Sequence, residues 1–513
     1  MATSAVSLAA AQRQLPLARP TGPGTLIGRT TWLLLLFVSV YGLMSVFVDN
    51  LLVRSIKDVL MLLFAGVSIL HVIRTHSALG SSLLALIGGM VVVGAFGVLT
   101  GIDVVAWVYG VKITILPLLL LFLGMYIAPQ LQRGALDKVY LTVFLAAIGG
   151  WLAQYLIGME RLMAMGFVYG VNIKHFADGM PRLSSIAFSP DNYAYLLAIA
   201  GLLLERSQLL ARRPWLRLAV KLTTGIFLML STIRSALVLW LVSQLCLFLL
   251  KLRGAGQGGL LWLALLLLAG PTLGTGLLLL LQERDLLAVG STLDRFGHWG
   301  DYLVSPLSLF GMMGFGLGAV GAASKRTVAL GRDSGSYAVD NQYLALYEQI
   351  GVAGVLLMTL LTVLLMARLL ANLRKADSAA EPAGLAGREI QTRPRTGAAG
   401  RETKSKLHTG AAGREIKSKL HTGAVGPSIA MPQAPASGPA IAQRVQVRRT
   451  ELAIALIAGG LFAGLTTNVL ELFPYNVFLW LAIGGCLLGP DEMQGKAHAS
   501  EASFSSENFQ RGG

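Results

Sequence analysis

The chain has 513 residues, of which 54% are hydrophobic and only 13% are charged, and its mean hydropathy is +0.66. Soluble domains carry about 25% charged residues, so this composition excludes an ordinary soluble protein and indicates a membrane protein. The net charge of +16 does not indicate nucleic-acid binding, because residues 369–450 hold 14 Lys and Arg against 5 Asp and Glu and so account for +9 of it. Cys246 and Cys486 both lie in apolar runs, which gives no basis for a disulfide, a zinc site or a redox motif.

Apolar runs long enough to cross a bilayer recur along the chain, since a hydrocarbon core ~30 Å thick takes about 20 residues of helix. We therefore predict an all-α polytopic membrane protein with about twelve transmembrane helices. The first run is interpreted as a retained helix and not as a signal peptide that is removed. The predicted spans are 31–48, 57–73, 82–100, 104–127, 138–157, 191–205, 218–233, 235–251, 259–281, 343–368, 451–468 and 475–489.

The distribution of Lys and Arg between the spans predicts the orientation, because cytoplasmic loops are enriched in these residues. It places both termini in the cytoplasm and leaves two long loops outside the membrane. The predicted organisation is a cytoplasmic tail (1–30), helices 1–10 (31–368) with extracytoplasmic loops 158–190 and 283–342, a cytoplasmic block (369–450), helices 11–12 (451–489) and a second cytoplasmic tail (490–513). The longer loop joins helices 9 and 10.

The cytoplasmic block contains a tandem repeat. Residues 396–408 read TGAAGRETKSKLH and residues 409–421 read TGAAGREIKSKLH. Two copies without a periodic apolar face cannot stack into a solenoid, so we predict a disordered insertion over 375–445. Its basic residues would either contact anionic lipid or serve only as a solvated tether.

Ionisable residues inside apolar spans are candidates for function, because each costs several kcal/mol unless it faces a cavity or a partner. Lys112 is interpreted either as a functional residue or as a side chain that extends toward the outer interface. Arg234, in STIRSALVLW, is expected at an extracytoplasmic hairpin between two apolar helices. An arginine fork there can bind a phosphate through two parallel hydrogen bonds, although pairing with lipid headgroups is the alternative.

A second group of polar residues lies at 182–198, RLSSIAFSPDNYAYLLA. Arg182 precedes Phe188, Ser189, Pro190 and Asn192, and the Pro and Asn favour a turn followed by a helix start. A simple helix cap explains the same spacing, and the sequence leaves both interpretations open.

The long loop contains glycines and one histidine of interest. Gly316, Gly318 and Gly321 formally satisfy G-x-G-x-x-G, but no βαβ unit surrounds them, so a dinucleotide site is excluded. These glycines are expected to let the backbone pass close to a ligand or to another helix. His298, next to Trp299, is interpreted either as an acid or base beside a stacked sugar or as a structural histidine.

The loop ends in VDNQYLALYEQIGVAGVLL, residues 339–357. Three- and four-residue spacings place Asp340, Tyr343, Tyr347 and Glu348 along adjacent faces of one helix. Polar groups at that depth predict the wall of a cavity.

Taken in order, these residues resemble the O-antigen ligase and O-antigen polymerase superfamily of bacterial inner-membrane proteins. The resemblance covers roughly 180–365. It rests on Arg182 with F-S-P-x-N (188–192), S-x-x-R-S-A (231–236), R-x-x-x-W (295–299), S-P-L (305–307), G-x-G-L-G (314–318), and D-N-Q-Y-L followed by E-x-x-G-x-x-G (340–354). Each motif alone is common, and their order and spacing are typical of the superfamily and not of one activity within it.

The resemblance implies a fold of the GT-C glycosyltransferase type and a substrate, carried on undecaprenyl diphosphate, that enters from the outer leaflet. It also implies that the enzyme requires no metal and no other cofactor. The family's loop arginines, thought to hold the diphosphate, correspond to Arg182, Arg234 and Arg295. Ligases often have His where this chain has Asp340, and that departure favours a polymerase of exopolysaccharide, capsule or O-antigen repeats over an O-antigen ligase.

The predicted chemistry needs guanidinium groups where negative charge develops on the departing diphosphate, and a base near the acceptor hydroxyl. Asp340, Glu348 and His298 are the candidate bases, with Asp340 preferred, and Arg234 and Arg295 are assigned to the diphosphate. The predicted substrate-binding residues are Arg182, Arg234, Arg295, Trp299, Asn341 and Tyr343. The implied partners are the undecaprenyl diphosphate-linked oligosaccharide, membrane lipid, a chain-length regulator and a flippase, with no nucleic acid.

Two alternatives from other functional classes stay open. A transporter or flippase of lipid-linked sugars would have paired ionisable residues at mid-membrane depth and similar halves, and the sequence indicates neither. A scaffold of an envelope complex would use the long loop to bind a protein partner.

Overall fold

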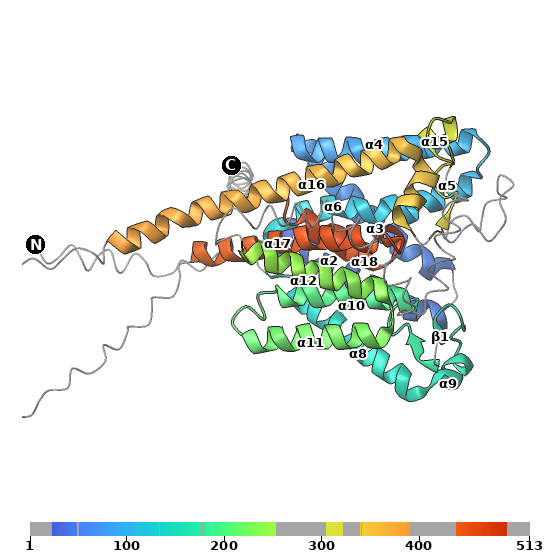
Figure 1. Cartoon of the computed structure of the whole chain (residues 1–513), viewed down its shortest axis with the longest axis horizontal. Coiled ribbons are helices and arrows are strands. Elements are labelled where there is room, and N and C mark those ends of the chain that lie inside the picture. Colours follow the sequence, from blue (N-terminus) through green and yellow to red (C-terminus); the bar gives the residue numbers. More distant parts are fainter. Residues whose placement is uncertain are drawn as a thin grey trace, which may run out of the picture.

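The structure is a computed structural model that describes residues 23–48, 51–132, 134–175, 179–252, 304–321, 339, 341–389 and 438–489. Over these residues the chain is a mostly helical, multi-pass membrane protein with one small antiparallel sheet (Figure 1). Seven of the described helical segments are long and apolar enough to cross a membrane. They are Thr30–Phe47, Ser55–Arg74, Ala78–Leu99, Val104–Tyr126, Asp137–Ile157, Arg234–Leu252 and Gln342–Ala376.

The described elements follow one another in this order: α2 (Pro23–Phe47), α3 (Leu51–Arg74), α4 (Ala78–Leu99), α5 (Val104–Gly110), the π-helix η1 (Val111–Ile115), α6 (Leu116–Tyr126), α7 (Ala128–Gln132), α8 (Asp137–Ile157), α9 (Met159–Ala164), β1 (Ile173–His175), β2 (Pro181–Leu183), α10 (Pro190–Glu205), α11 (Pro214–Ser231), α12 (Arg234–Leu252), α15 (Leu309–Met313), α16 (Gln342–Glu389), α17 (Gly438–Ala463), the 3-10 helix η6 (Val469–Glu471) and α18 (Tyr475–Gly484).

Every predicted span that lies within the described residues falls on a helix. The predicted division near Ser231–Arg234 is confirmed, because α11 ends at Ser231 and α12 begins at Arg234. The predicted span 259–281 lies outside the described residues. The total of twelve spans therefore stays a prediction, and α18, with 10 residues, is shorter than a full crossing requires.

The predicted span 104–127 is a single helical run that changes its winding in the middle. It passes from α5 through η1 into α6. Pro117 lacks an N–H group, and its ring clashes with the carbonyl of the residue four positions earlier, Ile113. The wider π-helix contains Ile113 and ends just before the proline, so the local sequence accounts for its position.

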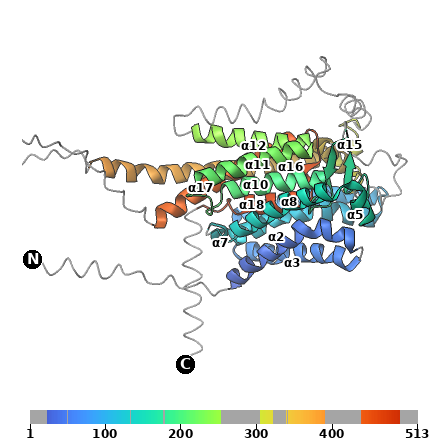
Figure 2. The same ribbon diagram turned by 90° about the horizontal axis from the view of Figure 1, so that it is seen from below.

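The most apolar helices occupy the centre of the bundle. A helix that is hydrophobic on all sides has no face for solvent and becomes buried, and α10, for example, is buried from Tyr193 to Leu204. Contacts lead from α3 to α6, from α6 to α18, from α18 to α10, and from α10 to α11 and α12. In Figure 2, α2 and α3 accordingly lie on one side of the bundle and α12 on the other.

The two ends of the bundle differ. One end carries α9, β1, β2 and α15, and we call it the sheet end; it lies at the right of Figure 1. At the other end, at the left of Figure 1, α16 extends out of the bundle, and we call this the projecting end. At the sheet end, β1 pairs antiparallel with β2. This sheet lies in the predicted loop 158–190 and is an addition to the all-α fold that the sequence predicts.

Two predicted boundaries are wrong. The disordered insertion was expected from residue 375 to residue 445, but α16 continues to Glu389 and α17 begins at Gly438. Five of the 14 residues in 376–389 are alanines, the strongest helix formers, and the helix extends beyond its apolar part despite Pro382 and two glycines. The first helix begins at Pro23, eight residues before the predicted span and within the predicted tail. Residues 390–437, with the tandem repeats, lie outside the described residues.

Candidate functional site

The sheet end brings two of the predicted arginines together through the turn that joins α11 to α12. Thr232 ends α11 in the left-handed conformation, with φ of 57°. Arg182, on β2, donates from Nε to Thr232 Oγ1 over 2.7 Å and from Nη2 to the Thr232 carbonyl over 3.1 Å. Two residues further on, Arg234 begins α12 with an exposed side chain. Arg182 therefore holds the turn that presents Arg234.

The surroundings of Arg234 favour an anion. Arg234 lies in the first turn of a 19-residue helix, where the backbone N–H groups and the helix dipole contribute positive potential. Arg182 lies half-buried on the neighbouring strand, opposite Lys174 in the sheet register. Arg182 binds the turn that precedes Arg234, and Lys174 lies opposite Arg182 on the neighbouring strand. We call Lys174, Arg182 and Arg234 the arginine site.

A carboxylate fixes one side of the arginine site. The Nζ atom of Lys174 lies 3.3 Å from Oδ2 of Asp191, in the first turn of α10. Ser189 is the N-cap of this helix and accepts a hydrogen bond from the Asn192 N–H over 3.2 Å. Of the two interpretations that the sequence allows, the helix cap is present, and it positions Asp191 toward the sheet. Sequence reasoning missed Lys174, because its pairing depends on a sheet that no motif indicated.

The glycine-rich segment 314–318 passes between two helices. The Phe315 N–H donates to the Glu348 carbonyl and the Gly316 N–H to the Gln349 carbonyl, both over 2.8 Å. Gly316 has φ of 105°, and a Cβ atom built on it would lie 2.5 Å from the Cα of Gly97 on α4. Of the two interpretations from the sequence, the structure places this backbone against other helices.

The start of α16 carries three predicted site residues, and the side chains of two of them, Asn341 and Tyr343, are bonded within the protein. Asn341 Oδ1 accepts from the backbone N–H groups of Tyr343 and Leu344 over 2.9 and 3.1 Å, in the manner of a helix N-cap. The Tyr343 hydroxyl donates to the Leu461 carbonyl on α17 over 2.7 Å. These contacts fix the start of α16 on α17, and substrate binding by Asn341 and Tyr343 stays a prediction.

Glu348 is more deeply buried than we expect of a general base, which must contact the acceptor sugar. Its side chain is only 1% exposed. Gln349, the next residue, accepts a hydrogen bond from the Gly318 N–H over 3.0 Å. Its Nε2 atom donates to Oε1 of Glu471 in η6 over 3.4 Å. Glu471 is half-buried. Sequence reasoning missed this carboxylate, although its isolation in the apolar turn 469–474 was a usable signal.

Four predicted site residues lie outside the described residues. They are Arg295, His298, Trp299 and Asp340. The structure thus joins Arg182 to the turn of Arg234, and it gathers Asn341, Tyr343 and Glu348 at the start of α16. The predicted catalytic contribution of the other four stays a prediction.

Lys112, which the sequence leaves open between a functional residue and a side chain that extends to the interface, pairs with a carboxylate on another helix. Its Nζ atom lies 2.7 Å from Oδ2 of Asp58 on α3, and Nζ of Lys57 lies 2.8 Å from Oδ1 of the same carboxylate. Lys112 therefore has a partner inside the protein and does not simply extend to the interface. The pairing was hidden from the sequence because Asp58 and Lys112 belong to different helices.

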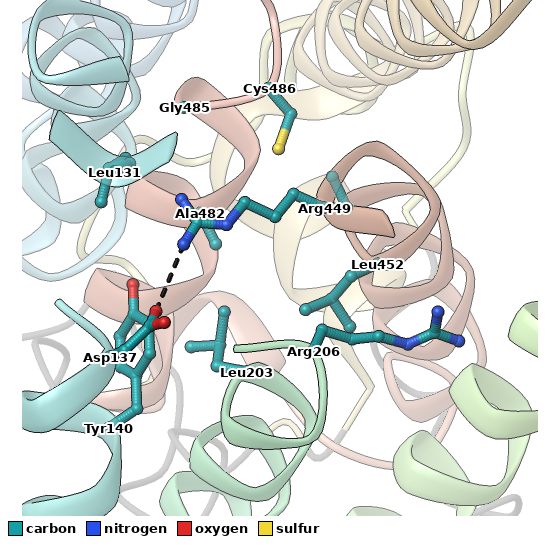
Figure 3. Close-up of a pocket in the computed structure, with 11 residues that line it drawn as sticks. Leu131, Asp137, Tyr140, Leu203, Arg206, Arg449, Leu452, Ala482, Gly485 and Cys486 are labelled. Carbon is teal, nitrogen blue, oxygen red and sulfur yellow. Dashed lines mark hydrogen bonds and ion pairs between the residues drawn. The ribbon is translucent and has the colours of Figure 1, made fainter. Parts of the chain in front are cut away.

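A small pocket lies nearer the projecting end, between α8, α10, α17 and α18 (Figure 3). Its volume is about 30 Å³, room for only one or two water molecules. Arg449 lies 3.2 Å from Oδ1 of Asp137, and Arg206, which also lines the pocket, lies 3.2 Å from Oε2 of Glu451. Each arginine is paired with a carboxylate, so the pocket suits an ionic link between helices better than it suits a sugar or a diphosphate.

The arginine site is therefore the candidate functional site. It combines exposed positive charge, a helix N-terminus and a rigid support at one end of the bundle. No protein-family model matches the chain, and no curated protein matches it.

Proposed function

We propose that this protein is a glycosyltransferase of the bacterial inner membrane that polymerises lipid-linked oligosaccharide repeats of an exopolysaccharide, capsule or O-antigen. The observation that carries the proposal is the turn at Thr232, which Arg182 holds so that Arg234 stands exposed at the start of α12. The proposal includes the resemblance to the O-antigen ligase and polymerase superfamily, a GT-C fold and twelve transmembrane helices. In this proposal the sheet end is extracytoplasmic and both termini are cytoplasmic.

The proposed reaction moves a glycan from undecaprenyl diphosphate to a sugar hydroxyl. The hydroxyl oxygen of the acceptor attacks the anomeric carbon of the donor, and the bond from that carbon to the diphosphate oxygen breaks. The proton of the hydroxyl goes to a base, for which Asp340 is our choice, and the electron pair leaves with the diphosphate. Because the diphosphate is already a good leaving group, the main task of the protein is to stabilise its developing charge.

Arginine suits this task. Its guanidinium is planar and always charged, and it can bind two phosphate oxygens at once. Arg234 is the described arginine with the most suitable surroundings, and Arg182 positions it while contributing positive charge. Removing one contact of this kind costs about 2.7–4 kcal/mol of barrier in comparable sites, or about 10²–10³ in rate. The chemistry needs no metal.

The test is a gel of products made by the purified protein in lipid from undecaprenyl diphosphate-linked oligosaccharide of its host. A ladder of repeats is the expected result, and Arg234→Ala should reduce it by about 10²–10³. Arg212→Ala is the matched control, because Arg212 is also an exposed arginine next to α11 but lies at its other end. Transfer of one block to lipid or protein without a ladder would identify a ligase.

Transport of lipid-linked sugars is the second candidate function. It is favoured by the contacts of Asp58 with Lys57 and Lys112, since transporters place paired charges within their spans. The same preparation distinguishes the two. Movement of substrate between leaflets without a new glycosidic bond would overturn the proposed polymerase.

A further inference from the structure

A cluster of three charged residues lies within the helices on the far side of the bundle from the arginine site. Asp58 on α3 forms two ion pairs. Its Oδ1 atom lies 2.8 Å from Nζ of Lys57, and its Oδ2 atom lies 2.7 Å from Nζ of Lys112 in η1. We call Lys57, Asp58 and Lys112 the lysine cluster. Two ammonium groups share one carboxylate, so the lysine cluster has a formal charge of +1.

Aromatic rings surround the lysine cluster. Nζ of Lys57 lies 4.9 Å from the ring centre of Tyr41 and 4.8 Å from that of Phe473, and Nζ of Lys112 lies 4.5 Å from that of Tyr109. At these distances the faces of the rings attract a cation. They stabilise the two ammonium groups in apolar surroundings, but they carry no negative charge to balance the extra positive one.

The lysine cluster lies within the apolar part of the helices, toward the sheet end. Lys57 lies about 3 Å along the apolar span Ser55–Arg74 from its first residue, and Lys112 lies about 12 Å along the apolar span Val104–Tyr126 from its first residue, at 1.5 Å per residue. A charge at the depth of Lys112 is costly unless it has a partner, and it marks a candidate functional position. A purely structural ion pair would be neutral. Within the part of the chain that the structure describes, Asp58 is the one carboxylate paired with the two lysines, so the second lysine calls for an anion.

The lysine cluster can be reached from outside the protein. The side chains of Lys57, Asp58 and Lys112 are 13%, 18% and 26% exposed. Lys112 lies in the π-helix, and such local changes of winding are frequent at functional sites. A phosphate group with its chain in the surrounding lipid would meet the ammonium groups directly.

The position of the lysine cluster suits a second substrate. The helices α6, α18 and α10 lie between α3 and the pair α11 and α12, so the cluster and the arginine site lie on opposite sides of the core (Figure 2). Polymerisation joins two glycans, each attached to its own lipid diphosphate, and one cationic site cannot hold both. A second cationic site on a separate face would keep the two lipid chains apart.

We propose that the lysine cluster binds the phosphate or diphosphate headgroup of a second isoprenoid lipid, the carrier of the other glycan, in the membrane. The inference rests on the proposed polymerase function. The proposal also concerns charge. Asp58 lowers the affinity of the lysine cluster for an anion, because its carboxylate already pairs with the ammonium groups of both lysines.

The experiment measures binding and not catalysis, so that the two proposals can fail separately. Native mass spectrometry of the full chain in detergent, with farnesyl diphosphate as the probe, should count two bound molecules. Lys112→Met or Lys57→Met should weaken the binding of one of the two probe molecules by about tenfold or more, which is the size expected for losing a charge-assisted contact. Lys138→Met is the control, because Lys138 is exposed near the projecting end of α8.

Asp58→Asn gives the decisive result. It raises the formal charge of the lysine cluster from +1 to +2 and should strengthen probe binding, which a damaged fold cannot do. Unchanged or weaker binding in Asp58→Asn, or full binding in both lysine variants, would overturn the proposal. Inorganic diphosphate separates the two sources of the anion: a free-anion site would bind it as tightly as the probe, and the lipid site should bind it more weakly. Two bound probes without any product ladder would contradict the polymerase and leave the lysine cluster in place.

Discussion

Arg182 donates two hydrogen bonds to Thr232, a residue fifty positions later in the chain, one to its hydroxyl and one to its backbone carbonyl. The two bonds attach strand β2 to the turn between α11 and α12. Because Thr232 is in the left-handed conformation, the turn is tight, and α12 starts two residues later at Arg234. The support of the arginine site therefore depends on a contact between distant segments.

The first prediction concerns this contact. Arg182→Ala removes both hydrogen bonds and should reduce the rate of polymer formation strongly, whereas Thr232→Ala keeps the carbonyl bond and should reduce it less. The double variant should lose less than the sum of the two, because the residues act through one interaction, with a coupling of about 0.5–3 kcal/mol. A double-mutant cycle on the rate of ladder formation measures the coupling. Strictly additive losses would show that Arg182 acts on the substrate alone.

The second prediction concerns the approach of segment 314–318 to α4. A Cβ atom on Gly97 would lie 2.3 Å from the Phe315 carbonyl oxygen, whereas one on Gly88 of the same helix would meet nothing within 4 Å. Gly97→Ala should therefore destabilise the protein, while Gly88→Ala should stabilise it by about 0.5–1 kcal/mol, since glycine within a helix costs that much relative to alanine. Thermal unfolding in detergent compares the two variants. Equal melting temperatures would contradict the close packing.

The sequence predicts helices well where the cause of the structure is local. The described spans were found because runs of about 20 apolar residues have few stable alternatives in a membrane. The division between α11 and α12 was predicted from the polar residues at 231–235, and the turn there is confirmed. The end of α16 does not follow from hydropathy, because the helix continues through the polar residues 376–389, which include Pro382 and two glycines.

The site was harder to predict, since its contacts join distant segments. Arg182 and Arg234 were selected one by one, but nothing in the sequence indicates that Arg182 binds Thr232. Lys112 was noticed for its charge, and its partner Asp58 was not, because the packing of α3 on η1 decides the pair. Fixing such contacts takes the three-dimensional arrangement of the helices, which spacing along one helix cannot supply.

The third prediction concerns the ionic link near the projecting end. Asp137 is 2% exposed and accepts a hydrogen bond from the Gln208 N–H over 2.6 Å, besides pairing with Arg449. Arg449→Met leaves a buried carboxylate without its cation and should destabilise the protein by about 3–5 kcal/mol. Adding Asp137→Asn should restore part of that loss, because the amide oxygen can still accept from Gln208.

Thermal unfolding of the single and double variants tests this prediction, with Lys138→Met as the control for loss of a neighbouring positive charge. The rate of polymer formation, measured well below the melting temperatures, should stay close to that of the unmodified protein, because the pair lies far from the sheet end. A double variant less stable than Arg449→Met alone would contradict the proposed role of the pair.

The fourth prediction separates the candidate bases. Glu348 is 1% exposed, so its carboxylate is poorly placed to receive a proton from a sugar hydroxyl. Glu348→Gln should therefore change the rate of polymer formation only a few-fold. Asp340→Asn should lower it by about 10²–10⁴, the usual contribution of a general base. Single-turnover assays with saturating lipid-linked donor measure the chemical step in both variants.

A loss of rate that follows a loss of folded protein would be no evidence for a base, so both variants need melting temperatures close to that of the unmodified chain. Retained polymer formation in Asp340→Asn would exclude Asp340 as the base. If Glu348→Gln were inactive as well, the half-buried Glu471 would become the next candidate, because Gln349 connects it to the segment 314–318. Glu471→Gln would then be expected to reduce the rate by the same factor, while leaving probe binding at the lysine cluster unchanged.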